Sequence, residues 1–187
     1  MSSDRARGRG RRVSAEGASA EFSEFFERHH AGLSRLACLL TGEPDAADDL
    51  AADAMVVLWQ RWPEVRRAGS PLAYARGTVA NLARERIRAA VRERRRIRLF
   101  WARGTEPAHG PDIAGVVTVR AALERLPFRK RACVVMRYAF DIPEREVAQA
   151  LGVSLGTVKS QTSKGVAELR RLLDTPAAEQ LVARSSR

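Results

Sequence analysis

The sequence predicts an all-α protein built from two small helical domains joined by a flexible linker. Three observations support this prediction. Apolar residues recur at steps of three and four along most of residues 22–173, which is the spacing of amphipathic helices. No segment shows the apolar and polar alternation of a strand. Glycines and prolines gather at residues 104–111, between two blocks of helical pattern, as they do at a domain boundary.

The composition favours a nucleic-acid-binding protein. The 187 residues carry a net charge of +11, and 45% of them are apolar, an ordinary share for a chain that buries a core. The positive charge indicates a polyanionic partner, nucleic acid before an anionic membrane. No apolar run approaches the roughly 20 residues of a membrane span. The Arg-rich N-terminus also lacks the apolar run of a secretory signal. We therefore expect a soluble, cytoplasmic protein.

The cysteines and histidines give no sign of catalysis or metal binding. Cys38 and Cys133 lie far apart within apolar helical patterns, so we expect two buried free thiols. His29 and His30 are adjacent, whereas His109 is distant, and neither cysteine has metal-ligand spacing to them. Serines lack a patterned base partner, and no phosphate-cradling glycine loop is present. We expect no catalytic residues, cofactor, metal or small-molecule substrate.

The breaks in the pattern divide the chain into five parts. Residues 1–18 are Arg, Gly and Ser with few apolar residues, which predicts a disordered basic arm. Residues 19–95 form the first domain, residues 96–115 the linker, residues 116–174 the second domain and residues 175–187 a frayed tail.

Three helices are expected in the first domain. The first covers about residues 22–40, with a stop at Gly42 after Thr41. The second runs over residues 45–62, and Pro63 is expected to end it. The third begins at Ser70-Pro71, since serine can cap a helix and proline fits its first position.

Charge is segregated between the last two of these helices. Residues 36–60 contain no Lys or Arg but hold five carboxylates: Glu43, Asp45, Asp48, Asp49 and Asp53. From residue 84 onward, the third helix and its extension hold eight arginines against two glutamates: Arg84, Arg86, Arg88, Arg92, Arg94, Arg95, Arg96 and Arg98, with Glu85 and Glu93. A solvated face usually mixes signs. An acidic helix suits a basic protein surface and a basic helix suits phosphates, so this pattern fits a protein that bridges another protein and DNA.

The second domain contains a strong helix-turn-helix pattern. A stripe through Val116, Val119, Leu123 and Leu126, ended by Pro127, precedes a stripe through Ala132, Val135, Tyr138 and Ala139. In residues 144–154 the first helix ends at Gly152, which permits a left-handed turn, Val153 plugs the angle between helices, and Ser154 can cap the next helix.

The second helix of this motif has one apolar and one polar face. The residues expected toward the core are Leu155, Val158, Thr162, Val166 and Leu169. The residues left facing outward are Gly156, Thr157, Lys159, Ser160, Ser163 and Lys164. A small, cationic face of this kind suits a recognition helix in the major groove of DNA, where lysine meets guanine or phosphate and hydroxyls meet either.

At these residues the chain resembles the extracytoplasmic-function (ECF) sigma factors of the sigma-70 family. The second domain is similar to region 4 through "LPFRKRACVVMRY", "EREVAQALGVSLGTVKS" and "LRRLL". The first is similar to region 2 through "DAADDLAADAMVVLWQRW" and "PLAYARGTVANLARERIR". "LLTGEPDAADDLA" and "GVSLGTVKSQTSKG" particularly resemble the actinobacterial sigma-E subgroup. The resemblance covers about residues 22–173.

The resemblance implies a partner for each surface. Residues at the acidic helix would grip the beta-prime clamp helices of core RNA polymerase: Asp48, Asp49, Leu50, Asp53 and Trp59. Residues of the third helix would capture an unstacked base and phosphates of the −10 promoter element: Tyr74, Asn81, Arg84 and Arg88. Region 4 would read the −35 element through Ser154 and the outward-facing residues of the second helix of the motif. It would also contact the beta flap of core polymerase. Relatives are commonly held by an anti-sigma protein, so such a protein is a candidate partner.

The chain departs from the family pattern at both expected contact surfaces, with Ala51-Ala52 in place of Val-Gln and Gln161-Thr162 in place of Arg-Leu. One alternative function is an autonomous helix-turn-helix regulator, which would carry a ligand-sensing or dimerisation domain at its N-terminus. A third function considered is that of a recombinase or nuclease, but this sequence contains no catalytic constellation for such an enzyme.

Overall fold

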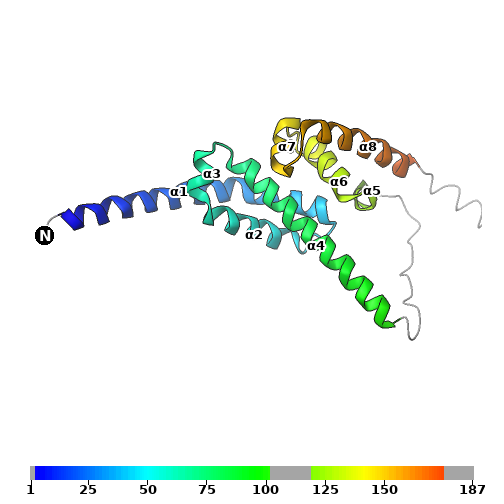
Figure 1. Cartoon of the computed structure of the whole chain (residues 1–187), viewed down its shortest axis with the longest axis horizontal. Coiled ribbons are helices and arrows are strands. Elements are labelled where there is room, and N and C mark those ends of the chain that lie inside the picture. The colour runs from blue at the N-terminus through cyan, green and yellow to red at the C-terminus, as the bar shows by residue number, and fades with distance from the viewer. Residues whose placement is uncertain (1–2, 102–118, 175–187) are drawn as a thin grey trace, which may run out of the picture.

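A computed structural model describes residues 3–101 and 119–174 of the chain, and these residues confirm the all-α prediction. The elements are α1 (Ser3–Thr41), α2 (Ala47–Gln60), α3 (Trp62–Arg67), α4 (Pro71–Trp101), α5 (Val119–Arg125), α6 (Phe128–Val134), the π-helix η1 (Val135–Ala139), α7 (Glu144–Leu151) and α8 (Leu155–Asp174). In Figure 1, α1 to α4 form one bundle, and α5 to α8 form a second that lies against α1 and α4.

The first bundle is held together by an apolar core between α1, α2 and α4. The predicted stripe of α1 is buried at Leu33, Leu36 and Leu40. The facing stripes bury Leu58 of α2 and Val79 of α4. Alanines fill the closest crossings of these helices: Ala37, Ala51, Ala54, Ala75 and Ala83. Small side chains at these positions let the helices approach, so the leucines interdigitate at native density.

Replacing Leu58 with alanine should destabilise the protein by about 2–5 kcal/mol, because Leu58 is 0% exposed and its removal leaves a cavity. Chemical denaturation followed by circular dichroism measures the change. Val56→Ala is the matched control, since Val56 lies on the same helix and is 55% exposed; its effect should stay below about 0.5 kcal/mol. Equal effects of the two substitutions would mean that Leu58 is not in the core.

The expected end of the second helix at Pro63 is wrong. Helix α2 stops at Gln60, and Pro63 lies in the first turn of the short helix α3, where proline is tolerated because its missing N–H would have no partner in the helix. Trp62 opens α3 and is buried against Phe22 and Phe25 of α1, with ring centroids 5.2 and 5.3 Å apart. These rings close the end of the bundle.

Two helices extend further than the sequence pattern predicted. Helix α1 begins at Ser3 and therefore runs through residues 3–18 of the arm that was expected to be disordered. Arginine, alanine and glutamate are good helix formers, and no proline interrupts this segment. Helix α4 continues to Trp101, beyond the boundary expected at residue 95, because no glycine or proline occurs between residue 95 and Gly104. The rest of the expected linker, residues 102–115, and the tail at residues 175–187 lie outside the described residues.

The second bundle packs α6 closely against α8. Gly165 of α8 is buried, and a Cβ there would lie 2.7 Å from the side chain of Val134 of α6, so the backbone of α8 packs directly on α6. Lys130 of α6 pairs with Glu168 of α8 at 2.6 Å beside this contact.

The predicted stripes are wrong at Val119, which is 57% exposed, at Tyr138, which is 69% exposed, and at Ala139, which is also exposed; Val116 lies outside the described residues. Val135 and Met136 of the π-helix η1 are still buried, but the wider turn of this helix carries Tyr138 and Ala139 away from the core.

No helix in the described residues is long and apolar enough to cross a membrane.

Candidate nucleic-acid and protein interfaces

The helix-turn-helix has the geometry that the sequence predicted. Gly152 ends α7 in the left-handed conformation, with φ of 61°. The backbone N–H of Thr157 donates to the Ser154 hydroxyl oxygen at 3.1 Å, so Ser154 caps α8. Val147 and Val158 are both buried where the two helices cross. The turn, the cap and the buried pair fix the angle at which α8 is presented.

The outward face of α8 is polar and open. Gly156, Lys159, Ser160, Ser163 and Lys164 are exposed, as expected, together with Ser154 at the cap. Thr157 is half-buried and shares a hydrogen bond of 2.8 Å with the Ser154 hydroxyl. The ammonium of Lys159 lies 3.9 Å from the Glu144 carboxylate. An ion pair at this distance on the surface is weak, so the lysine side chain remains available to bind another group.

One position on α8, Leu155, differs from the expectation, and two others, Gln161 and Thr162, form one of the departures from the family pattern. Leu155 is 37% exposed instead of buried, because it opens the helix ahead of the first crossing with α7. Thr162 is buried, whereas Gln161 is half-buried, so the departure at Gln161-Thr162 alters one core position and one position beside the polar outward face of α8.

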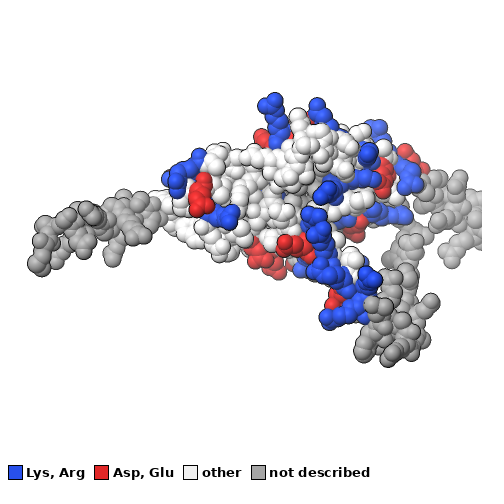
Figure 2. Space-filling model, viewed as in Figure 1, with Lys and Arg blue, Asp and Glu red and all other residues white. Residues whose placement is uncertain are grey.

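Helix α2 presents the acidic surface. Asp48, Asp49 and Asp53 are exposed, and Trp59, six residues beyond Asp53 on the same helix, is 43% exposed. Acidic side chains are visible on the lower side of the first bundle in Figure 2. Leu50, in contrast, is buried in the core, so it supports the helix and does not meet a partner directly. The chain also departs from the family pattern on this helix, at Ala51-Ala52. Ala51 is buried in the core like Leu50, and only Ala52 reaches the surface.

An apolar groove continues this surface onto α1, and sequence reasoning did not predict it. It has a volume of about 330 Å³ and is lined by Phe22, Phe26, Met55, Val56 and Trp59, among others. Phe26 belongs to the apolar pattern at steps of three and four along α1, but its side chain is 38% exposed. The sequence did contain a sign of this groove, because phenylalanines at both 25 and 26 make the apolar stripe wider than one face of the helix.

Helix α4 presents a basic surface. Asn81 and Arg88 are exposed, while Tyr74 and Arg84 are half-buried. Arginines further along are also exposed, and Figure 2 shows a row of basic side chains along the projecting part of this helix. Arg86 is engaged elsewhere, because it pairs with Glu43 at 2.6 Å. An open row of guanidinium groups is suited to following a phosphate backbone.

The structure brings the basic surface of α4 and the helix-turn-helix together. A cavity of about 360 Å³ is lined by Tyr74 and Asn81 from α4 and by Gln149 and Gly152 from the other bundle. A second cavity, of about 210 Å³, is lined by Asn81 and Arg84 on one side and by Thr157 on the other. No local pattern in the sequence indicates that these segments face each other.

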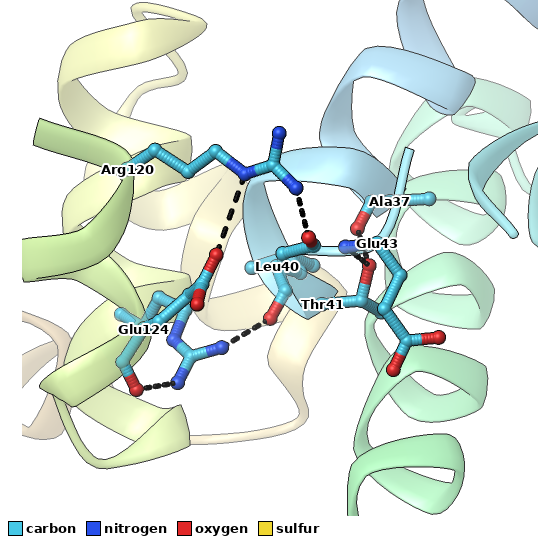
Figure 3. Close-up of polar contacts among 8 residues, drawn as sticks. Ala37, Leu40, Thr41, Glu43, Arg120 and Glu124 are labelled. Atoms are coloured by element: carbon cyan, nitrogen blue, oxygen red, sulfur yellow. Dashed lines mark hydrogen bonds and ion pairs between the residues drawn. The ribbon is translucent and has the colours of Figure 1, made fainter. Parts of the chain in front are cut away.

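Arginines of the second bundle cap the end of α1. The last carbonyl groups of a helix lack partners within it. Arg131 of α6 donates to the carbonyl oxygen of Leu40 at 2.6 Å, and Arg120 of α5 donates to that of Gly42 (Figure 3). Arg131 also donates to the carbonyl oxygen of Glu124 at 2.5 Å. Burial lowers the pKa of Arg131, although the Glu124 carboxylate opposes this effect.

The fold and these surfaces define a two-domain helical protein with a helix-turn-helix, a basic surface on α4 and a separate acidic surface on α2. Comparisons with protein families give the class. Residues 25–93 match the model of sigma-70 region 2, and residues 117–169 match that of sigma-70 region 4.

Relatives narrow the class to one group. The ECF RNA polymerase sigma factor SigM of Mycobacterium tuberculosis is 31% identical over 160 residues, covering 81% of this chain and 76% of that protein. The RNA polymerase sigma-E factor of Streptomyces coelicolor is 30% identical over 164 residues, covering 88% of each chain. The chain therefore belongs to the ECF sigma factors of RNA polymerase, which confirms the resemblance. The alternative of an autonomous regulator loses its support, since the N-terminal domain is sigma region 2.

Solved structures share the fold. The sigma factor RpoE of Bartonella quintana, in complex with the anti-sigma factor NepR, superposes with a TM-score of 0.59 at 21% identity, covering 83% of this chain and 98% of that one. CnrH, in complex with the cytosolic domain of CnrY, gives a TM-score of 0.59 at 24% identity, covering 88% and 96%. In the described ranges of this chain, no group of three His, Cys, Asp or Glu side chains could hold a metal ion.

Proposed function

We propose that this sigma factor docks on core RNA polymerase through the acidic surface of α2, binds and melts the −10 element with α4, and reads the −35 element with α8. One observation carries the proposal. An acidic face and a basic face lie on neighbouring helices of one bundle, and a capped recognition helix lies in the other. The protein would act in the cytoplasm as a specificity factor, with no catalytic residue of its own.

The contact with core polymerase combines charge and apolar area. Asp48, Asp49 and Asp53 would meet a basic surface on the beta-prime clamp helices, and complementary charge speeds and orients docking. The groove beside Trp59 would bury an apolar side chain of the same partner, as a desolvated anchor does in other interfaces. Leu50 acts indirectly by fixing α2 in the core.

Melting of the −10 element requires energy that α4 supplies. Unstacking costs a few kcal/mol per base step. Tyr74 can stack on a splayed base and Asn81 can pair with its edge, while Arg84 and Arg88 hold the neighbouring phosphates. These contacts form only after the base leaves the duplex, so they offset the cost of melting. The second domain would hold the −35 element as duplex and contact the beta flap.

An anti-sigma protein is proposed as a further partner. The sigma factor RpoE, which shares this fold, was solved with the anti-sigma factor NepR bound, and CnrH, of the same fold, was solved with the cytosolic domain of CnrY bound. A protein that covers the acidic surface of α2 or the outward face of α8 would block polymerase or DNA in this chain.

Footprinting of a promoter complex tests the assignment of the two DNA surfaces. With core polymerase and this protein present, DNase protection should cover two blocks about two helical turns apart, and permanganate should react with thymines only in the downstream block. A mutation of the upstream block should weaken binding without moving the reactive thymines. Thymines reactive in the upstream block would contradict the proposal.

Free protein should bind duplex DNA weakly and with a steep dependence on salt. If about six phosphates are contacted, the logarithm of the binding constant should fall with the logarithm of salt concentration with a slope of about −5. Fluorescence anisotropy with a labelled duplex at several salt concentrations measures the slope. Binding that does not depend on salt would contradict a phosphate-led contact.

A further inference from the structure

A leucine lies at the surface among the polar residues of the helix-turn-helix. Leu155 opens α8 and is 37% exposed, although the sequence pattern placed it in the core. It is the one large apolar side chain that is exposed within the described helix-turn-helix, residues 144–164. Val158, three residues further, is completely buried. Single exposed leucines are common on protein surfaces, so the position of Leu155 decides what its exposure means.

Leu155 lies between two groups that are suited to DNA. Lys159 follows four residues later, so it shares a face of α8 with Leu155, about 6 Å along the helix axis. On the other side, a groove of about 540 Å³ is lined by Leu155 and by the start of α7 at Pro143, Glu144 and Arg145, among others. Arg145 is exposed there. In a helix-turn-helix the first helix crosses the phosphate backbone, and the N-terminal residues of the second helix contact base edges. Leu155 therefore occupies a position from which a base edge is within reach.

The chemistry of a leucine side chain selects one feature of the major groove. Base edges there present hydrogen-bond donors and acceptors, and the apolar group among them is the C5-methyl group of thymine. A donor or acceptor placed against Leu155 would lose its water without gaining a partner, which is unfavourable. A thymine methyl group has no hydrogen bond to lose, and its contact with leucine removes apolar surface from water. Leu155 thus favours thymine over the other bases.

We propose that Leu155 is a specificity-determining residue of the −35 contact, where it packs against the methyl group of a thymine. This inference rests on the proposed function of α8. Successive base pairs are about 3.4 Å apart along the duplex, so the distance of about 6 Å between Leu155 and Lys159 corresponds to about two base pairs. The thymine therefore lies within about two base pairs of the group that Lys159 contacts, on the side of the start of α7.

Replacement of thymine by deoxyuridine tests this contact, because it removes the methyl group and leaves base pairing intact. Each thymine of the upstream protected block, on either strand, is replaced in turn in a promoter fragment. Filter binding at fixed salt then measures the affinity of holoenzyme assembled from core polymerase and the full-length protein. One replacement should lower the affinity of the wild type about fourfold, the effect of burying one methyl group. The same replacement should have no effect on Leu155→Ala, which lacks the side chain that meets the methyl group.

Two further variants serve as controls. Leu173→Ala removes a leucine with 38% exposure near the far end of the same helix, and it should keep the sensitivity of the wild type to deoxyuridine. Leu155→Met supplies an apolar side chain of similar volume and should restore the sensitivity that alanine abolishes. Alanine and methionine are both good helix formers, so neither variant at position 155 should disturb α8.

The outcomes separate this inference from the proposed function. Equal affinity of the wild type for every substituted promoter would overturn the role of Leu155, and so would a Leu155→Ala variant that stays as sensitive as the wild type. In both cases α8 would still read the −35 element through its polar face. A wild-type holoenzyme that protects no upstream block would instead overturn the proposed function of α8.

Discussion

Asp49→Arg should abolish transcription by weakening the complex with core polymerase at least 30-fold, which corresponds to about 2 kcal/mol. Asp49 is exposed on α2 between Asp48 and Asp53, so the arginine would face the same basic partner that the carboxylates attract. The substitution alters no core contact. Binding of fluorescently labelled protein to core polymerase, measured by anisotropy at fixed salt, gives the change in affinity.

The matched control for this reversal is Asp174→Arg. Asp174 is exposed at the end of α8, remote in sequence from the acidic surface, and the change in charge is the same. It should leave affinity for polymerase within about twofold, because surface substitutions away from a contact have small effects. Equal loss in both variants would show that net charge, and not the surface of α2, governs docking.

Lys159→Glu should lower the affinity of the assembled holoenzyme for a promoter about 30-fold, or about 2 kcal/mol. Lys159 is exposed in the first two turns of the recognition helix, and a glutamate there faces DNA with the wrong charge and lies beside Glu144. Filter binding with promoter fragments at fixed salt measures the loss. Affinity for core polymerase should not change, because the acidic surface of α2 is in the other bundle and Lys159 belongs to the face of α8 proposed for DNA and not to the contact with the beta flap.

Arg125→Glu serves as the control for this second reversal. Arg125 is exposed on α5, away from the recognition helix in sequence, and its reversal removes the same charge from the same domain. A loss confined to Lys159→Glu supports direct contact between α8 and DNA. Similar losses in both variants would mean that the domain attracts DNA only by its overall charge.

Local chemistry explains which parts of the fold the sequence predicted. The buried stripes of α1 and α4 and the turn at Gly152 follow from spacing, backbone freedom and capping within a few residues. The errors arise where one signal permits two outcomes. Pro63 was expected to end a helix, but it starts one, and proline is compatible with both positions. Phe25 and Phe26 are both apolar, and only packing with Trp62 decides which is buried.

Each candidate surface could be predicted from the sequence by itself, but the positions of the surfaces relative to one another could not. Asp49 and Lys159 were predicted from charge pattern and motif, and both are exposed as expected. The packing of α7 against α4 brings Gly77 close to the backbone carbonyl of Ala150, a contact that side-chain patterns do not reveal. A partial signal existed at Arg131, which lies on the same helix face as Phe128 and Val135 in an otherwise apolar stripe, and therefore needed a buried partner.

Run-off transcription with purified core RNA polymerase tests the central claim most directly. A pool of genomic promoter fragments is transcribed with and without the protein. We expect discrete transcripts only when the protein is present, and none with Asp49→Arg. If the protein instead binds fragments tightly without polymerase and no transcript starts, it is not a polymerase-dependent specificity factor and the assignment of the acidic surface on α2 is wrong.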